Sequence, residues 1–150
     1  MGKQKIVKTK CKNQSKEKQI PLNAEKTGYD DKEPAWRFNR LDIEYEDWDL
    51  DWCEDLRKKL AAFEGQSWRE IKQAAGGRSA GTNSHYVGYD NLTDKAQKRF
   101  DKLNLDKEWN LFSLRLKGKE RIIGYIEDGV MHIIWHDQNH EVVKTTKRNT

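Results

Sequence analysis

Two arginines and two histidines in the last third of the chain are the side chains best suited to chemistry. Arg115, Arg121 and His136 belong to three apolar segments that follow one another, and His140 comes four residues later. A guanidinium can bind phosphate through two parallel hydrogen bonds, and a histidine can take up or release a proton near neutral pH. These groups together could stabilise the charge that develops when a phosphodiester is cleaved and move the protons involved.

The segments that must position these residues are predicted to form a three-stranded antiparallel meander over residues 110–116, 120–127 and 130–136. Asp128-Gly129 favours a two-residue type I′ turn, which needs positive φ at both central positions. Gly118 fits the left-handed position of a three-residue loop between the first two strands.

The turn lengths also predict the register of the meander. Arg115 should face Arg121, and Arg121 should face His136, so that the three side chains form a transverse row on one face of the sheet. Like charges directly opposite each other are destabilising, so the row indicates an anion site, unless it is simply a solvated face. The neighbours expected around the row are Ser113, Tyr125 and His132. The opposite face is predicted to be the core, with Phe112, Leu114, Leu116, Ile122, Ile126, Met131, Ile133 and Trp135.

The rest of the chain predicts an α+β fold. The expected elements are a strand over 37–45, a helix to about residue 64 that includes Trp52, a helix over 68–75, a loop over 78–90 and a helix from Thr93 to Leu103. Ser67 and Glu70 match a capping box, and His85 in the loop is either an active-site member or a surface residue. The sheet is expected to be antiparallel, one N-terminal strand plus the meander, with two to three helices on one face and the other face open.

Composition divides the chain into a lysine-rich arm over 1–33, expected to be disordered, and a single domain over 34–150. The arm would bind nucleic acid weakly or only add solubility. No apolar run approaches the roughly 18 residues of a membrane span. Cys11 and Cys53 do not form a disulfide framework. We therefore expect a cytoplasmic protein without a membrane partner.

Residues 111–143 resemble the C-terminal meander of RelE/ParE-type toxins. The shared pattern is an apolar strand ending in Arg-Leu, a glycine turn, a strand beginning with arginine, an acidic turn, an apolar strand and a polar close. The resemblance implies a basic sheet face that binds mRNA, including mRNA on the ribosome, and cleaves it through the 2′-hydroxyl without a metal or other cofactor. It also implies a neutralising antitoxin as partner.

The resemblance assigns catalysis to Arg115, Arg121, His136 and His140. The residues expected to bind nucleic acid are Arg115, Arg121, Tyr125, His132, Lys117, Lys119 and Lys144. Val143 stands where many active members have tyrosine. The alternatives are therefore a catalytically inactive RelE-like domain that binds nucleic acid or protein, and an interaction domain with no nucleic-acid role.

A metal site is a further alternative, because His132, His136, Asp137 and His140 are ligand-capable and closely spaced. His132 and His136 are expected on one face of a single strand, about 13 Å apart at the usual rise. Both could bind one ion only if the strand bends.

Overall fold

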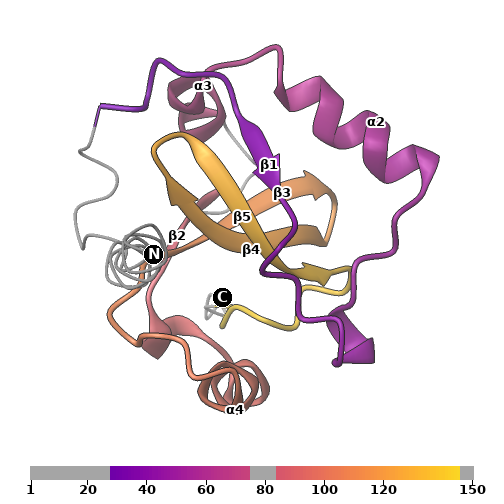
Figure 1. Cartoon of the computed structure of the whole chain (residues 1–150), viewed down its shortest axis with the longest axis vertical. Coiled ribbons are helices and arrows are strands. Elements are labelled where there is room, and N and C mark those ends of the chain that lie inside the picture. The colour runs from indigo at the N-terminus through magenta and orange to yellow at the C-terminus, as the bar shows by residue number, and fades with distance from the viewer. Residues whose placement is uncertain (1–27, 75–83, 146–150) are drawn as a thin grey trace, which may run out of the picture.

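The structure, a computed structural model, describes residues 28–74 and 84–145. Its centre is a five-stranded mixed sheet in the order β1-β5-β4-β3-β2. The strands are β1 (Ala35–Arg37), β2 (His85–Val87), β3 (Leu111–Lys117), β4 (Glu120–Glu127) and β5 (Val130–Asp137). The prediction of a purely antiparallel sheet is wrong, because β1 pairs in parallel with β5 (Figure 1). It also lacked β2, which lies within the stretch expected to be a loop.

The predicted meander is confirmed as β3, β4 and β5. Asp128 and Gly129 between β4 and β5 have φ of 51° and 84°, as a type I′ turn requires. Gly118 between β3 and β4 has φ of 55°. Glycine adopts this left-handed conformation without steric cost. The residues of the two turns therefore allow β3, β4 and β5 to reverse direction and pair as antiparallel neighbours.

A β-bulge in β5 changes the predicted register. Gly124 pairs with Ile133 and Ile123 with Trp135, so Ile134 is an extra residue in β5. A Cβ atom at Gly124 would lie 2.0 Å from the carbonyl oxygen of His132, so only glycine fits at this point. From Trp135 onward the side chains of β5 point to the faces opposite to those predicted.

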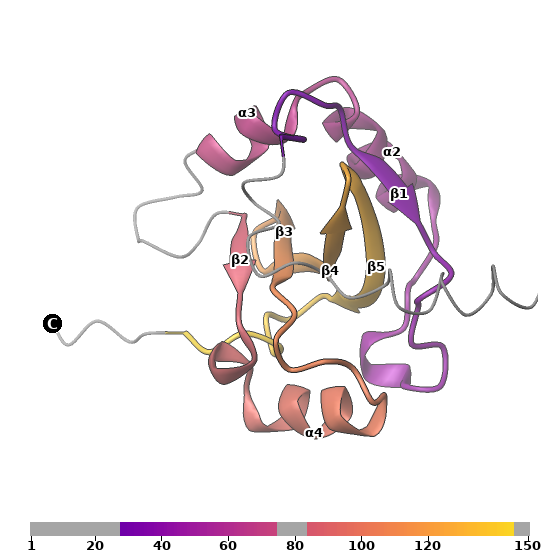
Figure 2. The same ribbon diagram turned by 60° about the vertical axis from the view of Figure 1, so that its left-hand side comes forward.

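Both faces of the sheet are covered (Figure 2). One face, the α2 side, packs against α2 (Glu54–Phe63) and α3 (Trp68–Gln73). The other, the α4 side, packs against α4 (Asp94–Lys102), the 3-10 turn η2 (Glu46–Trp48) and the segment that follows β5. The prediction of helices on one face with the other open is therefore wrong.

Each side has its own apolar cluster. The α2-side cluster includes the predicted core residues Phe112, Leu114, Ile122, Ile126, Met131 and Ile133 together with Leu56, Leu60, Trp68 and Ile71. The α4-side cluster includes Trp48, Leu92, Ala96, Phe100, Trp109, Ile123, Ile134, Trp135, Val142 and Val143. Trp135 is buried as predicted, but on the α4 side, because of the bulge.

The strand predicted over 37–45 is wrong apart from Arg37, the last residue of β1. Ile43, expected inside, is 73% exposed, whereas Asp42, expected outside, is 5% exposed. The Asp42 carboxylate accepts hydrogen bonds from Arg99 Nε at 2.6 Å and from Trp135 Nε1 at 3.0 Å. These partners compensate the burial of its charge, and the chain turns to reach them.

The helix ends predicted from the sequence agree with the structure better than the predicted strand over 37–45 does. The Ser67–Glu70 capping box and the Thr93 cap of α4, whose Oγ1 accepts from the Ala96 N–H, are both confirmed. α2 begins after Cys53, whose sulfur accepts from the Leu56 N–H. Trp52, predicted in the core, lies before this helix and is 54% exposed.

The structure describes only part of the predicted N-terminal arm. Residues 1–27 of the predicted arm lie outside the described residues, and Tyr29, also placed in the arm, is buried beside Trp68. Among residues 28–74 and 84–145, no helix is long and apolar enough to cross a membrane.

Candidate nucleic-acid interface

Arg115 and Arg121 face each other on β3 and β4, as predicted. Both point to the α4 side of the sheet, since they alternate with Leu114 and Ile122 of the α2-side cluster. Arg115 is half-buried, and Arg121 is only 3% exposed. Nη1 of Arg121 donates to the carbonyl oxygen of Gly118 at 2.6 Å, which ties the guanidinium to the β3–β4 turn.

The pair is electrostatically unfavourable. Burial lowers the pKa of Arg121 below its ordinary value, and the positive charge of Arg115 lowers it further, while Asp137 acts in the opposite direction. Arginine nevertheless keeps its proton in proteins. Two like charges at opposed positions of a sheet cost free energy, which a bound anion would recover.

Asp137 lies opposite Arg121 on β5 and is buried. Its carboxylate oxygens accept from the backbone N–H groups of Glu141 and Val142, both at 2.9 Å. These bonds close a turn in which His140 has φ of 59°. Nδ1 of His140 is buried and has no hydrogen-bond partner in the part of the chain that the structure describes. The turn therefore holds the half-buried His140 shortly after Asp137, the residue of β5 that lies opposite Arg121.

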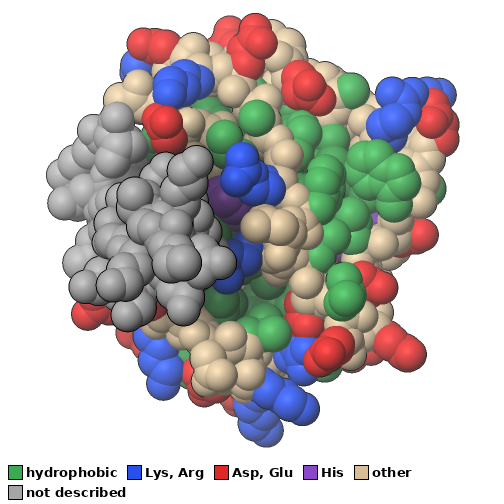
Figure 3. All heavy atoms as spheres, viewed as in Figure 1, with side chains coloured by type: hydrophobic (Ala, Val, Ile, Leu, Met, Phe, Trp, Pro, Cys, Tyr) green, Lys and Arg blue, Asp and Glu red, His purple; other side chains and the backbone are tan. Residues whose placement is uncertain are grey.

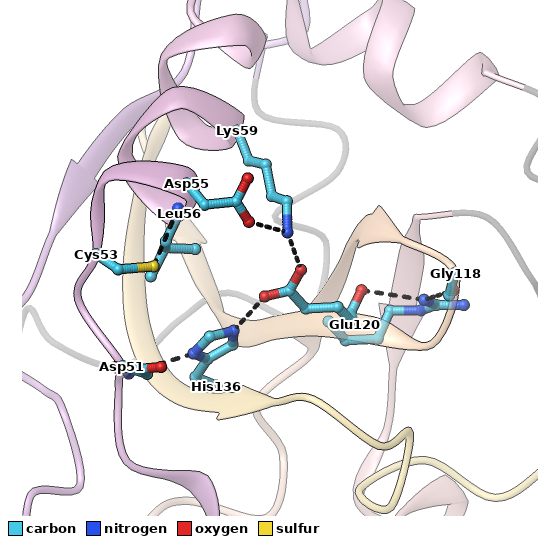
Figure 4. Close-up of polar contacts among 9 residues, drawn as sticks. Asp51, Cys53, Asp55, Leu56, Lys59, Gly118, Glu120 and His136 are labelled. Carbon is cyan, nitrogen blue, oxygen red and sulfur yellow. Dashed lines mark hydrogen bonds and ion pairs between the residues drawn. The ribbon is translucent and has the colours of Figure 1, made fainter.

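His136 is not in the predicted row. It faces Ile122 on the α2 side, because the bulge reverses its direction, and it is 3% exposed. Its Nε2 lies 2.7 Å from Glu120 Oε2, and its Nδ1 accepts the backbone N–H of Asp51 at 3.3 Å (Figure 4). Both ring nitrogens are thus engaged within the protein, and the structure does not bring His136 to the arginine pair.

Glu120 connects this histidine to α2. Burial raises the pKa of Glu120, but hydrogen bonds with Lys59 and His136 outweigh it, so the pKa lies below its ordinary value. Lys59 Nζ lies 2.5 Å from Glu120 Oε1 and 2.7 Å from Asp55 Oδ2. The network fastens α2 and the segment before it to β4 and β5.

Tyr125 and His132 lie on the α4 side at the other end of β4. Their rings stack at 4.5 Å with an angle of 8°, and Trp109 lies at 4.9 Å from Tyr125. Arg37 of β1 pairs in register with His132. Figure 3 shows Lys or Arg side chains above and below a histidine near the middle of this view. Tyr125 is 1% exposed, so its ring is not available for stacking with a ligand.

The predicted lysines lie in two places. Lys117 and Lys119 are exposed on the turn beside the arginine pair. Lys144 lies beside the 3-10 turn η3 (Tyr89–Asn91), where its Nζ donates to the carbonyl oxygen of Asp90 at 3.0 Å. Only the first two extend the positive charge of the arginine pair.

Sequence reasoning gave Ser113 only a peripheral place and missed Ser84. Ser113 faces His85 of β2 on the arginine side of the sheet, and its buried Oγ has no hydrogen-bond partner among the described residues. Ser84 Oγ accepts the backbone N–H of Arg115 at 3.0 Å. No signal in the sequence identified β2, the strand that brings Ser84 next to β3.

The metal alternative does not fit this geometry. His132 points to the α4 side and His136 to the α2 side, because Ile134 adds a residue between them. Two histidines on opposite faces of a sheet cannot bind one ion. The expectation that they share a face is therefore wrong.

Comparisons of the chain with protein-family models, with curated proteins and with solved structures found no match. The resemblance to RelE/ParE-type toxins therefore remains a prediction from the pattern over 111–143.

Proposed function

We propose that this protein is a RelE-like RNA-binding protein that holds a phosphodiester beside Arg115 and Arg121 and cleaves it with His140 as the proton-transfer group. The observation that carries the proposal is the Arg115–Arg121 pair, two cations opposite each other on adjacent strands. A phosphate oxygen near both guanidiniums would replace their repulsion with charge-assisted hydrogen bonds.

The surroundings of the pair favour a polyanion over a single small anion. Lys117 and Lys119 are exposed on the turn that joins the two strands, so positive charge extends beyond the arginines. Several phosphates in succession can use all of these charges, and each contact releases counterions from the nucleic acid. Arg121, which is bonded to the turn carbonyls, contributes charge from a fixed position, and Arg115 is the more accessible of the two.

The cleavage step follows from the chemistry of RNA. The 2′-oxygen loses its proton and attacks the adjacent phosphorus, and the bond from phosphorus to the 5′-oxygen breaks as that oxygen gains a proton. The products are a 2′,3′-cyclic phosphate and a 5′-hydroxyl end. His140 would exchange a proton with one of these oxygens and water with the other, and the arginines would stabilise the charge on the phosphoryl oxygens.

Binding without cleavage is the second candidate, and one observation favours it. Val142, Val143 and α4 cover the middle of the α4 side, so a strand of RNA could reach the arginine pair only at the end of this face. Val143 also occupies the position where many active members of the resembled family have tyrosine. Under this alternative the arginine pair binds RNA and no bond is broken.

The test uses the full chain and an end-labelled single-stranded RNA. We expect retention of the RNA at low salt, a linear fall of log affinity with log salt concentration, and fragments ending in cyclic phosphate. Arg115→Ala should weaken binding and abolish cleavage, whereas His140→Ala should abolish cleavage and retain binding. Arg57→Ala, which removes one exposed positive charge from α2 on the opposite side of the sheet, is the matched control.

The outcomes separate the two candidates. Salt-dependent binding that needs Arg115, with no fragments from the wild-type protein, supports the inactive binding domain. Equal loss of binding in the Arg115 and Arg57 variants, or no binding at low salt, rejects both.

A further inference from the structure

A second feature of the α4 side is a cavity of about 200 Å³ beside Tyr125. Its apolar walls are Leu41, Leu103, Leu105 and Ile134, and its polar groups come from Asn39, Arg40 and Tyr125. Pockets for drug-sized ligands usually measure about 300–1,000 Å³, so this one suits a single ring system. The loop after β1 and the loop after α4 form its sides, and the sheet forms its floor.

The polar end of the cavity is positively charged. Burial raises the pKa of Tyr125, and the nearby charge and hydrogen bond of Arg40, together with the charge of Arg37, act in the opposite direction. Of the two arginines, only Arg40 hydrogen-bonds with the Tyr125 hydroxyl, while Arg37 acts through its charge and the charge of Glu127 raises the pKa of Tyr125. The ion pairs between the described residues do not include Arg37 or Arg40, whereas Arg99, on the same side of the sheet, is paired with Asp42.

We infer that this cavity binds one nucleobase of an RNA strand, with Arg40 holding the phosphate attached to that nucleotide. The inference deepens the proposed function and rests on it, because the strand would be the one held at Arg115 and Arg121. Tyr125 and Arg121 are four residues apart on one face of β4, about 13 Å at the usual rise. Val142, Val143 and α4 cover the sheet between these two residues, so the RNA strand would pass around them and not along β4.

The lining favours a base over other occupants. The flat apolar faces of a base fit between leucine and isoleucine side chains, and its polar edge can bond with the Asn39 amide and the Tyr125 hydroxyl. A purely apolar ligand would displace water from the Asn39 amide and from Arg40 without replacing its hydrogen bonds, which costs free energy. An isolated anion would leave the apolar walls unfilled. The base would not stack on Tyr125, since His132 and Trp109 already cover that ring.

The experiment follows the leucine methyl signals of the full-length protein by NMR during titration with each of the four ribonucleoside 5′-monophosphates. We expect the methyl groups of Leu41, Leu103 and Leu105 to shift in a saturable way, while Leu60 and Leu114 on the α2 side do not. Inorganic phosphate serves as the probe for an anion alone. If it reproduces the same shifts, or if no nucleotide moves the three signals, the inference is rejected.

Two variants and a control locate the binding. Arg40→Ala should weaken nucleotide binding by about tenfold or more, as the loss of a charge-assisted hydrogen bond predicts. Leu105→Phe, which fills the cavity, should abolish the shifts. Lys98→Ala removes the same charge from the exposed side of α4 and should leave affinity unchanged. An equal effect of the Arg40 and Lys98 variants would show general electrostatic attraction and overturn the inference.

Failure of this inference is distinguishable from failure of the proposed function. Methyl shifts that persist while Arg115→Ala leaves RNA binding intact would retain the base pocket and reject the arginine site. RNA binding that depends on Arg115 without any methyl shift would retain the arginine site and reject the base pocket.

Discussion

His136 Nε2 lies 2.7 Å from Glu120 Oε2, and the opposite ring nitrogen accepts the N–H of Asp51. The acceptor role of Nδ1 requires that Nε2 carries a proton, which it can donate to the carboxylate. The pair joins β5 to β4, and through Lys59 to α2. This histidine therefore has a structural explanation that does not need a substrate.

Glu120→Gln should lower the free energy of unfolding at neutral pH by about 1–3 kcal/mol, because hydrogen bonds to a charged group are lost. The wild-type pKa is depressed below 4.5 in the folded state, so the stabilisation is complete above about pH 4.5 and is lost as pH falls through the folded-state pKa. The variant should therefore lose less stability on acidification. Urea unfolding at several pH values measures both effects, with exposed Glu33→Gln as the control. A variant with the wild-type acid dependence would contradict this explanation.

Asp42→Asn should be among the most damaging polar substitutions. The Asp42 side chain is buried, the Arg99 side chain is only 10% exposed, and Trp135 also donates to the carboxylate. Removing one partner of such a pair typically costs about 3–5 kcal/mol. Denaturant unfolding should show a lower midpoint with an unchanged slope. Asp47→Asn, at the exposed pair with Lys95, is the control and should have little effect. Equal losses in the two variants would show that burial is not the cause.

Gly124→Ala should prevent the observed register of β4 and β5. The added Cβ would lie 2.0 Å from a backbone carbonyl oxygen, which cannot move like the end of a flexible side chain. We expect a large loss of thermal stability or no folded protein. Gly88→Ala is the matched control, since no atom lies within 4 Å of its added Cβ. Near-native melting of the Gly124 variant would show that the bulge is not fixed by this contact.

Arg115→Ala should change stability and RNA binding in opposite directions. Without RNA, removal of the like charge beside Arg121 should stabilise the fold, by roughly 0.2–1 kcal/mol. Thermal melting at low salt with and without RNA measures this directly, and RNA should raise the melting temperature of the wild-type protein more than that of the variant. A variant that melts earlier than the wild type in the absence of RNA would mean that Arg115 stabilises the fold.

The features predicted correctly from sequence are those set by neighbouring residues. The Asp128-Gly129 turn, the Thr93 cap and the Ser67–Glu70 capping box each depend on a few adjacent positions. The Arg115–Arg121 pair was also predictable, because the bulge near Leu116 lies on the turn side of it. The sequence therefore predicted the arginine pair of the candidate site correctly, but not the position of His136.

The errors arose where distant residues decide the structure. The extra residue Ile134 in β5 has no local signature, and it alone separates His136 from Arg121. The alternation over 41–45 suggested a strand, but the partners of Asp42 are Arg99 and Trp135, far along the chain. A strand as short as β2 is defined by its pairing with β3 more than by its own sequence.

The two outer strands, β1 and β2, have three residues each. Pro34 precedes β1 and has no N–H to donate to another strand. A partner that added its own strand to either edge could therefore form only a few backbone hydrogen bonds. For the same reason, these short edges are poor templates for fibril growth. A protein inhibitor of the proposed activity would thus gain little by adding a strand and more by neutralising side-chain charge, and acidic peptides would be better competitors than extended apolar ones.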